Sequence, residues 1–256
     1  MIGFQERPFA KGDIKMLKTL GSYDCETFEF EGKQAIVVMP PKGKANGKWI
    51  LKSEYWGAFP EAEIALLENG WHVAYIRNDT RFATAQECER KARFVLFVSE
   101  KYSLNKKCSQ VGMSCGGAHA VRFAGLYPEL TACIYIDAPV LNYCSFPGKM
   151  DGGGCEQIWE DEFVKAYPGI KRYQLVNSDI HPLNMIDSLI RNKIPVLMVW
   201  GTEDSSVNYK ENGLLFEQAY ENNPLLETVC VSGRGHHPHG TFNENREIID
   251  FIIKNG

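Results

Sequence analysis

The chain of 256 residues has no long apolar run, no excess of basic charge and no closely spaced cysteine pair. A membrane-spanning helix needs roughly 18 consecutive apolar residues, and no stretch of the sequence approaches that length. Residues 1–20 carry charges throughout and lack the apolar core of a signal peptide. We therefore expect a cytoplasmic protein without a membrane partner.

The charge balance and the cysteines exclude further classes of protein. With 28 basic and 32 acidic residues the formal net charge is −4, so no basic field favours binding to nucleic acid. The eight cysteines include no C-x-x-C pair, which disfavours a zinc finger or a redox motif. In a reducing compartment they are expected to be small, mostly buried apolar residues. What is left is the composition of an ordinary globular enzyme, with 44% hydrophobic and 23% charged residues.

Short strand-like and longer helix-like segments alternate along most of the chain. The nearly continuous apolar run 71–76 is typical of a strand buried on both faces. Thr84 and Glu87 form a capping-box pattern at the start of a long helix-like segment. Such alternation predicts one α/β domain over residues 1–256, with a mostly parallel central sheet flanked by helices on both faces. Strands are expected at 27–30, 34–39, 48–55, 71–76, 110–113, 131–136, 194–200 and 227–231, and helices at 59–69, 84–102, 115–126, 210–221 and 243–254.

The stretch at about 140–187 breaks this alternation. It holds several glycines, including the run 152–154, and amphipathic helix patterns near 156–167 and 183–192. Because it lies between two expected core strands, we expect it to form a small cap insertion over the edge of the sheet.

Residues 112–117 read Gly-Met-Ser-Cys-Gly-Gly and contain the pattern G-x-S-x-G. They lie directly after an expected strand and directly before an expected helix, which is the context that this motif needs. Small residues on either side of the serine let strand and helix pass close together, and the helix N-terminus directs N–H groups toward a developing oxyanion. Ser114 is therefore the candidate nucleophile.

A serine nucleophile needs a base, and the base needs a carboxylate that orients it. With this motif the acid and then the histidine follow the serine along the chain. Asp204 follows the expected strand 194–200 and is the first candidate for the acid, with its neighbour Glu203 as a rival. Asp137, at the end of the strand 131–136, is a lower-ranked acid, and it could also contact substrate or hold the loop before the cap.

Three of the six histidines lie within the segment 233–240, after the last expected strand. His236 follows directly on Gly235 and is the candidate base, while His237 and His239 are expected to brace the loop or to face substrate. A metal site is another interpretation of H-H-x-H, but no acidic or cysteine cluster accompanies it, so no metal is predicted. The remaining histidines are expected to be structural; they are His72, His119 and His181.

Four parts of the sequence carry a resemblance to a known family. The first joins residues 55–60 and 71–76, and the others are residues 112–117, 134–140 and 235–239. In these stretches the chain resembles a group of α/β-hydrolases described as carbohydrate esterases, from about Trp49 to the C-terminus. The G-A-F-P and G-H-H-P-H motifs are more specific than the serine motif. The resemblance implies an α/β-hydrolase fold and a triad of Ser114, Asp204 and His236. Similar proteins usually carry a larger polar residue where Cys115 stands, so the oxyanion side of the pocket, and with it the substrate, could differ.

The oxyanion hole is expected to combine two backbone N–H groups. One is that of Cys115, the residue after the nucleophile. The other is expected from the loop after the strand 48–55, where the usual His-Gly is absent. The N–H of Tyr55 or of Trp56 is expected to serve there.

Glu54 stands beside that loop and has two interpretations. It could bind sugar hydroxyls or a cation, or it could form an ion pair with Lys52 or Arg77. Aromatic residues of the cap could stack on sugar rings or form an ordinary cap core; they are Tyr143, Phe146, Trp159 and Tyr173. The candidate substrate contacts are thus Glu54, Asp137, His237 and Trp159.

The triad pattern predicts a serine hydrolase that needs no cofactor. The first hypothesis is an esterase that removes a small acyl group, such as acetyl, from a small-molecule or oligosaccharide ester. The second is a serine peptidase, because G-x-S-x-G-G also occurs in prolyl-oligopeptidase-like enzymes; those usually add a propeller domain, for which this chain is expected to be too short. The third is a non-catalytic binding protein, which would need none of the triad residues. A homo-oligomer is compatible with all three.

Overall fold

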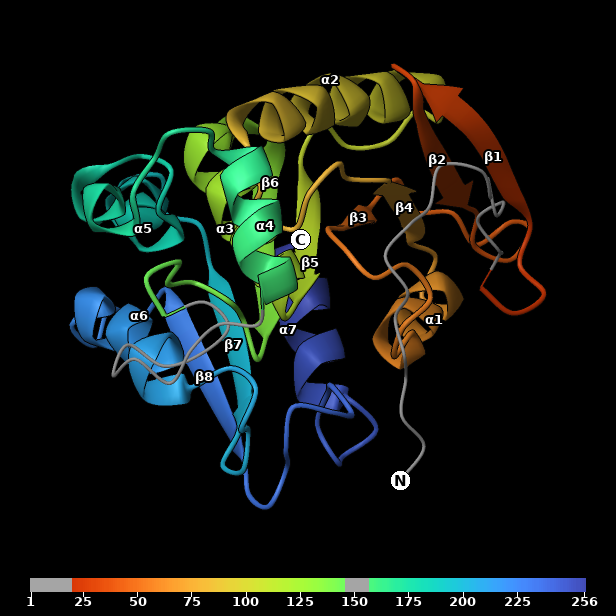
Figure 1. Ribbon diagram of the computed structural model, residues 1–256. Coiled ribbons are helices and arrows are strands. Elements are labelled where there is room, and N and C mark those ends of the chain that lie inside the picture. Colours follow the sequence, from red (N-terminus) through yellow and green to blue (C-terminus); the bar gives the residue numbers. More distant parts are fainter. Residues whose placement is uncertain (1–19, 146–156) are drawn as a thin grey trace.

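The computed structural model describes residues 20–145 and 157–256. The strands of these residues form one eight-stranded sheet in the order β1-β2-β4-β3-β5-β6-β7-β8 (Figure 1). β2 is antiparallel to both of its neighbours, β1 and β4, and every other neighbouring pair is parallel. The strands are β1 (Cys25–Phe30), β2 (Lys33–Val38), β3 (Trp49–Lys52), β4 (His72–Ile76), β5 (Cys108–Met113), β6 (Thr131–Asp137), β7 (Val196–Gly201) and β8 (Leu226–Val231).

Helices cover both faces of this sheet, as predicted. Successive residues of a strand point to opposite faces. In β2, Ile36 and Val38 pack in the cluster that contains α1 and α7, whereas Ala35 and Val37 pack in the cluster that contains α2. α3, α5 and α6 share a further cluster, and Phe123 of α3 joins the α2 cluster, so these helices lie on the α2 face. The helices are α1 (Glu61–Glu68), α2 (Ala85–Lys101), α3 (Cys115–Leu126), α5 (Ile186–Arg191), α6 (Gly213–Tyr220) and α7 (Arg246–Asn255).

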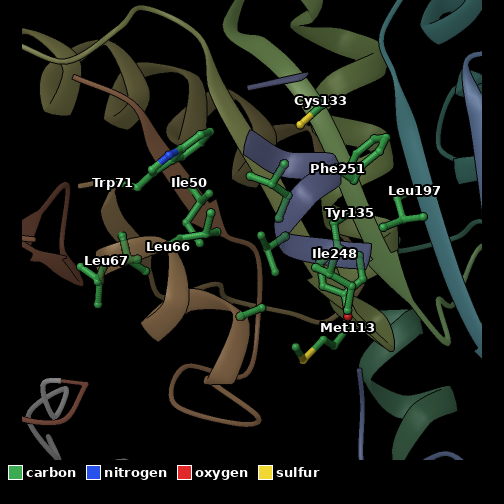
Figure 2. Packing of buried hydrophobic residues seen from close by; sticks show 14 of the residues in the cluster. Ile50, Leu66, Leu67, Trp71, Met113, Cys133, Tyr135, Leu197, Ile248 and Phe251 are labelled. Carbon is green, nitrogen blue, oxygen red and sulfur yellow. The ribbon is translucent and has the colours of Figure 1, made fainter. Parts of the chain in front are cut away.

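The face covered by α1 and α7 carries a continuous apolar core (Figure 2). Leu66 of α1 and Ile248 of α7 are fully buried there against Ile50 of β3 and Tyr135 of β6. Burial of apolar surface is the main favourable contribution to folding. This core lies directly beneath the central strands, whose carboxyl ends carry the residues described below.

The capping signal at the start of α2 is confirmed, whereas one expected strand is shorter than predicted. The hydroxyl of Thr84 accepts a hydrogen bond from the N–H of Glu87, and the Glu87 carboxylate accepts one from the N–H of Thr84, which confirms the capping box of α2. The main difference is the strand expected at 48–55, which ends at Lys52. Tyr55 and Phe59 have φ angles of 54° and 46°. A strand cannot continue through residues in the left-handed region, so the chain leaves the sheet and forms a loop.

The stretch 140–187, expected to form a cap, is described only in part, because residues 146–156 lie outside the described residues. It contains α4 (Gln157–Ala166) and two 3₁₀ turns, η2 (Arg172–Asn177) and η3 (Pro182–Met185), before α5. Phe163 of α4 packs with Phe82 and with Cys115 at the start of α3. Leu189 of α5 belongs instead to the cluster beneath α3, so α5 is part of the helix layer. No helix in the described part of the chain is both long and apolar enough to span a membrane.

Candidate active site

The turn between β5 and α3 holds Ser114 in a strained conformation, with φ 51° and ψ −121°. Strand and helix pass so closely here that a Cβ on Gly112 would lie 2.3 Å from the carbonyl oxygen of Gly116. The N–H of Ser114 donates to the carbonyl of Asp137 over 2.9 Å, and the Ser114 carbonyl accepts from the N–H of Val140 over 2.9 Å. These bonds fix the serine at the carboxyl edge of the sheet, as a nucleophile elbow requires.

The structure brings Ser114, His236 and Asp204 together in one hydrogen-bonded chain. Nε2 of His236 lies 3.1 Å from Oγ of Ser114, and Nδ1 of His236 lies 2.8 Å from Oδ2 of Asp204. The side chains of His236 and Asp204 are 11% and 4% exposed, so water is largely excluded from the pair. Glu203, the rival acid, is exposed, and its backbone N–H donates to the carbonyl of Arg234.

The surroundings of Asp204 keep its carboxylate ionised. Burial alone would raise its pKa, but the hydrogen bond and charge of His236 and the N–H groups of Val207 and Ser206 outweigh it and lower the pKa. Both N–H groups lie 2.9 Å from Oδ1 of Asp204. An ionised carboxylate only accepts hydrogen bonds, so Nδ1 of His236 must carry a proton. The lone pair of Nε2 in the neutral imidazole then faces the Ser114 hydroxyl.

Asp137, predicted as a possible acid or substrate contact, has a different role in the structure. Its side chain is fully buried and forms a bidentate ion pair with Arg234, over 2.6 Å and 3.0 Å. Its oxygens also accept from Nδ1 of His239, the N–H of Gly240 and the hydroxyl of Tyr135, over 3.1, 2.7 and 2.9 Å. Burial alone would raise the pKa of Asp137, but the hydrogen bond and charge of His239 and the charge of Arg234 lower it. Asp137 thus holds the loop that carries His236 and does not face a substrate, because both oxygens bond within the protein.

The other two histidines of the loop contact the loop after β3. The ring of His237 is exposed and stacks on Phe59, with centroids 5.5 Å apart. His239 is buried and meets the edge of Phe59 at 5.2 Å. Two loops that are far apart in the sequence therefore brace each other beside Ser114.

The expected oxyanion donors belong to two segments, the start of α3 and the loop after β3. Cys115 is the first residue of α3, so its N–H has no acceptor within the helix. Its thiol is hydrogen-bonded to the hydroxyl of Tyr55, and burial raises the pKa of Cys115 to about 12, which keeps the thiol neutral. Trp56 stacks on Tyr75 with ring centroids 5.5 Å apart. Tyr55 thus contacts the nucleophile turn through Cys115, whereas Trp56 packs on β4.

Glu54 lies directly against the turn, since a Cβ on Gly116 would come within 3.2 Å of the Cβ of Glu54. Its carboxylate accepts a hydrogen bond from the amide of Asn78. Burial raises the pKa of Glu54, and the bonds from Asn78 and the backbone of Tyr55 only partly oppose this. The interpretation as an ion pair with Lys52 is wrong, because Lys52 pairs with Glu63 in the core.

A buried lysine supports the same loop from α2. Nζ of Lys91 donates to the carbonyl of Ser53 over 3.2 Å and lies 3.0 Å from Nδ1 of His119. Nε2 of His119 lies 3.0 Å from the carbonyl of Thr80, which only accepts, so Nε2 carries the proton and Nδ1 accepts from Lys91. Burial lowers the pKa of both Lys91 and His119. The chain of contacts links α2, α3 and the loop that begins at Ser53.

Trp159 of α4, predicted to contact substrate, lies under an arginine. The guanidinium of Arg81 is 3.6 Å from the centre of the Trp159 ring, and it pairs with Glu162 over 2.7 Å. Tyr143 is fully buried, and its hydroxyl donates to the carbonyl of Phe82 over 2.6 Å, so it belongs to the core under the cap. Phe146 lies outside the described residues.

Two supporting residues, Arg234 and Lys91, were not identified from the sequence. Lys91 stands on the apolar stripe of its helix, with Cys88 and Val95 on the same side, and a lysine there indicates a buried partner. Arg234 stands between two glycines beside the candidate base, but nothing in the sequence pairs it with Asp137.

Comparison with known proteins supports the fold. No family model and no curated protein matches the sequence. Dipeptidyl peptidase 4 from Porphyromonas gingivalis is 14% identical and matches 91% of this chain with a TM-score of 0.69, but the chain spans only 35% of its length. Est1E from Butyrivibrio proteoclasticus is 14% identical with a TM-score of 0.65, and the match covers 90% of this chain and 98% of that one. S-formylglutathione hydrolase from Staphylococcus aureus is 13% identical with a TM-score of 0.64, over 91% and 98% of the two chains. The chain has the α/β-hydrolase fold, as predicted.

Proposed function

We propose that this α/β-hydrolase fold carries a serine hydrolase that cleaves carboxylic esters through an acyl-enzyme. The observation that carries the proposal is the continuous chain from Oγ of Ser114 through His236 to Asp204, over 3.1 Å and 2.8 Å. A non-catalytic binding protein has no need of this arrangement.

The reaction follows from the protonation states of these groups. Nε2 of His236 takes the hydroxyl proton as Oγ of Ser114 attacks the ester carbonyl, and Asp204 stabilises the imidazolium. The tetrahedral oxyanion accepts hydrogen bonds from the N–H of Cys115 and from a second N–H in the loop after β3. Trp56 is the proposed second donor, because the N–H of Tyr55 bonds to the carboxylate of Glu54. His236 then gives its proton to the leaving alcohol, and the acyl group stays on Oγ. Water, activated by His236, releases the acid in the second half of the reaction.

A small acyl group on a carbohydrate or a related small molecule is the proposed substrate class. The choice of a carbohydrate depends on the resemblance of the G-A-F-P and G-H-H-P-H stretches to carbohydrate esterases. Support for a small ester substrate comes from two solved structures that match nearly over their whole length, Est1E and S-formylglutathione hydrolase. Among the four substrate contacts predicted from the sequence, His237 is exposed, Glu54 and Trp159 are partly buried, and Asp137 is fully buried.

A serine peptidase is the second candidate. Two solved dipeptidyl peptidase structures match 91% of this chain, with TM-scores of 0.66 and 0.69. The same triad chemistry would then cleave an amide, with His236 protonating a leaving amine in place of an alcohol.

Paired chromogenic substrates separate these functions. The full chain and its Ser114→Ala variant are assayed with p-nitrophenyl acetate and butyrate and with aminoacyl p-nitroanilides. The ester proposal predicts turnover of the acetate ester above that of every anilide, and a loss of about four to six decades in Ser114→Ala. Preferential turnover of anilides would replace the ester proposal with the peptidase. An inactive wild-type chain would point to a binding protein. A panel of acetylated oligosaccharides then tests the carbohydrate.

A further inference from the structure

Three imidazoles gather at the mouth of the proposed site. His236, His237 and His239 each offer a nitrogen, and these atoms all lie within 4.8 Å of one another. The ring centroids are 4.6 Å apart for His236 and His237 and 5.1 Å apart for the other two pairs. One short loop thus brings together three imidazole nitrogens that could bind the same metal ion.

The rings of His236 and His239 each contact a carboxylate, as metal-binding histidines commonly do. Nδ1 of His236 is 2.8 Å from Asp204, and Nδ1 of His239 is 3.1 Å from Asp137. A metal-ligating histidine usually gives its other ring N–H to a carboxylate, which fixes the ring and raises its basicity. Here each carboxylate takes Nδ1, so Nε2 is the nitrogen left for a metal. No acidic cluster stands beside the histidines in the sequence, but the fold brings Asp204 and Asp137 to that outer position.

The third ring, that of His237, is the one that a metal ion can reach from solvent. His237 is exposed, whereas His239 is 8% exposed and the side chain of His236 is 11% exposed. Zinc with about 2.0–2.1 Å bonds to nitrogen in a tetrahedron holds its ligand nitrogens about 3.3 Å apart. The ligand atoms of the cluster lie within 4.8 Å of one another, so zinc would draw the rings together, and the exposed ring of His237, which stacks on Phe59, can move toward the other two.

We propose that His236, His237 and His239 bind one Zn²⁺ ion and that the ion switches the proposed hydrolase off. Three imidazoles suit zinc better than calcium or magnesium, which prefer oxygen ligands. Zinc on Nε2 of His236 takes the lone pair that lies 3.1 Å from the Ser114 hydroxyl, so the serine loses its base. The binding part of the inference stands on the geometry alone, and the inhibition part rests on the proposed function.

Metal binding is measured by equilibrium dialysis of the full chain, freed of metals, against ZnCl₂ in a buffer that does not bind zinc, with MgCl₂ as the comparison. We expect one Zn²⁺ per chain and no Mg²⁺. His237→Gln changes an exposed side chain and should weaken zinc binding at least about tenfold, since it removes one of three ligands. His72→Gln removes an imidazole of β4 outside the cluster and should leave zinc binding unchanged. Asp204→Asn removes an outer carboxylate and should weaken binding by about 10–100-fold.

The Ser114→Ala variant separates this inference from the proposed function. It should bind zinc as the wild type does, whether or not the chain hydrolyses esters. If the wild type hydrolyses p-nitrophenyl acetate, zinc should abolish that activity, EDTA should restore it, and His237→Gln should need at least about tenfold more zinc. A wild-type chain that takes up no zinc, or a His237→Gln variant that binds zinc as tightly as wild type, would overturn the proposal.

Discussion

Asp204 and Asp137 follow or end neighbouring strands and are both shielded from solvent, yet they hold different groups. Asp204 orients the imidazole of His236, whereas Asp137 joins Arg234 and His239 and so fixes the backbone of the same loop. The first contact acts on the protonation of the base, and the second acts on the position of the whole loop.

Substitution to asparagine should separate these two roles. Asp204→Asn keeps the shape but presents an amide to Nδ1 of His236, so kcat should fall by about 10⁴, the order of loss that a mispaired histidine tautomer causes in a serine protease. Asp137→Asn leaves Arg234 buried without its charge partner and should lower the free energy of unfolding by about 3–5 kcal/mol. Ester kinetics and urea denaturation of both variants measure the two effects. An Asp137→Asn enzyme of normal stability that is slower than Asp204→Asn would contradict this division.

The hydrogen-bonded set of Ser114, His236 and Asp204, the proposed triad, was predictable from the sequence because each member follows a strand signal in the order that the fold imposes. Ser114 has a motif, and His236 follows Gly235 after the last strand. The choice between Asp204 and Asp137 was not predictable with certainty, since both stand at strand ends. Only the distances in the folded chain separate them, because the register between β6, β7 and the histidine loop is a tertiary property.

At the scale of elements, α2 supports the loop that is expected to supply the second oxyanion donor. Lys91 reaches from α2 to the carbonyl of Ser53, while Lys52 of β3 donates to the carbonyl of Ala58 over 2.7 Å. The loop between Ser53 and Ala58 is therefore held by two buried lysines, Lys91 at its start and Lys52 at its end.

Lys91→Met keeps the length of the side chain but removes its donor to Ser53 and His119. The loop should shift, and a misplacement of about 1 Å can cost up to about 10²-fold in rate. We expect kcat for p-nitrophenyl acetate to fall with little change in KM. Lys101→Met, at the exposed end of the same helix, is the matched control and should behave as wild type. Equal kinetics for the two variants would show that α2 does not position the loop.

Helix positions were more predictable than this loop. The capping box at Thr84 and the elbow after β5 are local patterns, so α2 and α3 begin where the sequence indicates. The strand expected at 48–55 stops at Lys52, because the path after it is set by contacts with residues far along the chain. Phe59 packing on His237 is one such contact.

At the scale of the whole molecule, three buried histidines couple folding to pH. Burial lowers the pKa of His181 to about 4 and lowers the pKa of His72 and of His119 as well. An unfolded histidine has a pKa of about 6.5. Between the two values the unfolded chain binds a proton that the folded chain does not, so unfolding becomes easier as the pH falls.

Folding stability should therefore be fully present above about pH 6.5 and decline toward pH 4. His181 alone accounts for about 3 kcal/mol over that window, from its pKa of about 4. Urea denaturation between about pH 7 and 5 measures the slope, and His181→Gln should reduce it. A stability that stays constant or rises as the pH falls through this range would refute the neutral, buried state of these histidines.

Labelling with a fluorophosphonate, followed by intact-protein and peptide mass spectrometry, tests the nucleophile and its base together. The structure predicts one adduct per chain, on Ser114, because its hydroxyl lies 3.1 Å from an imidazole nitrogen whose ring is held by a carboxylate. His236→Ala should slow the labelling by orders of magnitude, since the serine then lacks its base. An adduct on another residue, or equal labelling rates for wild type and His236→Ala, would contradict the assignment of Ser114 and His236.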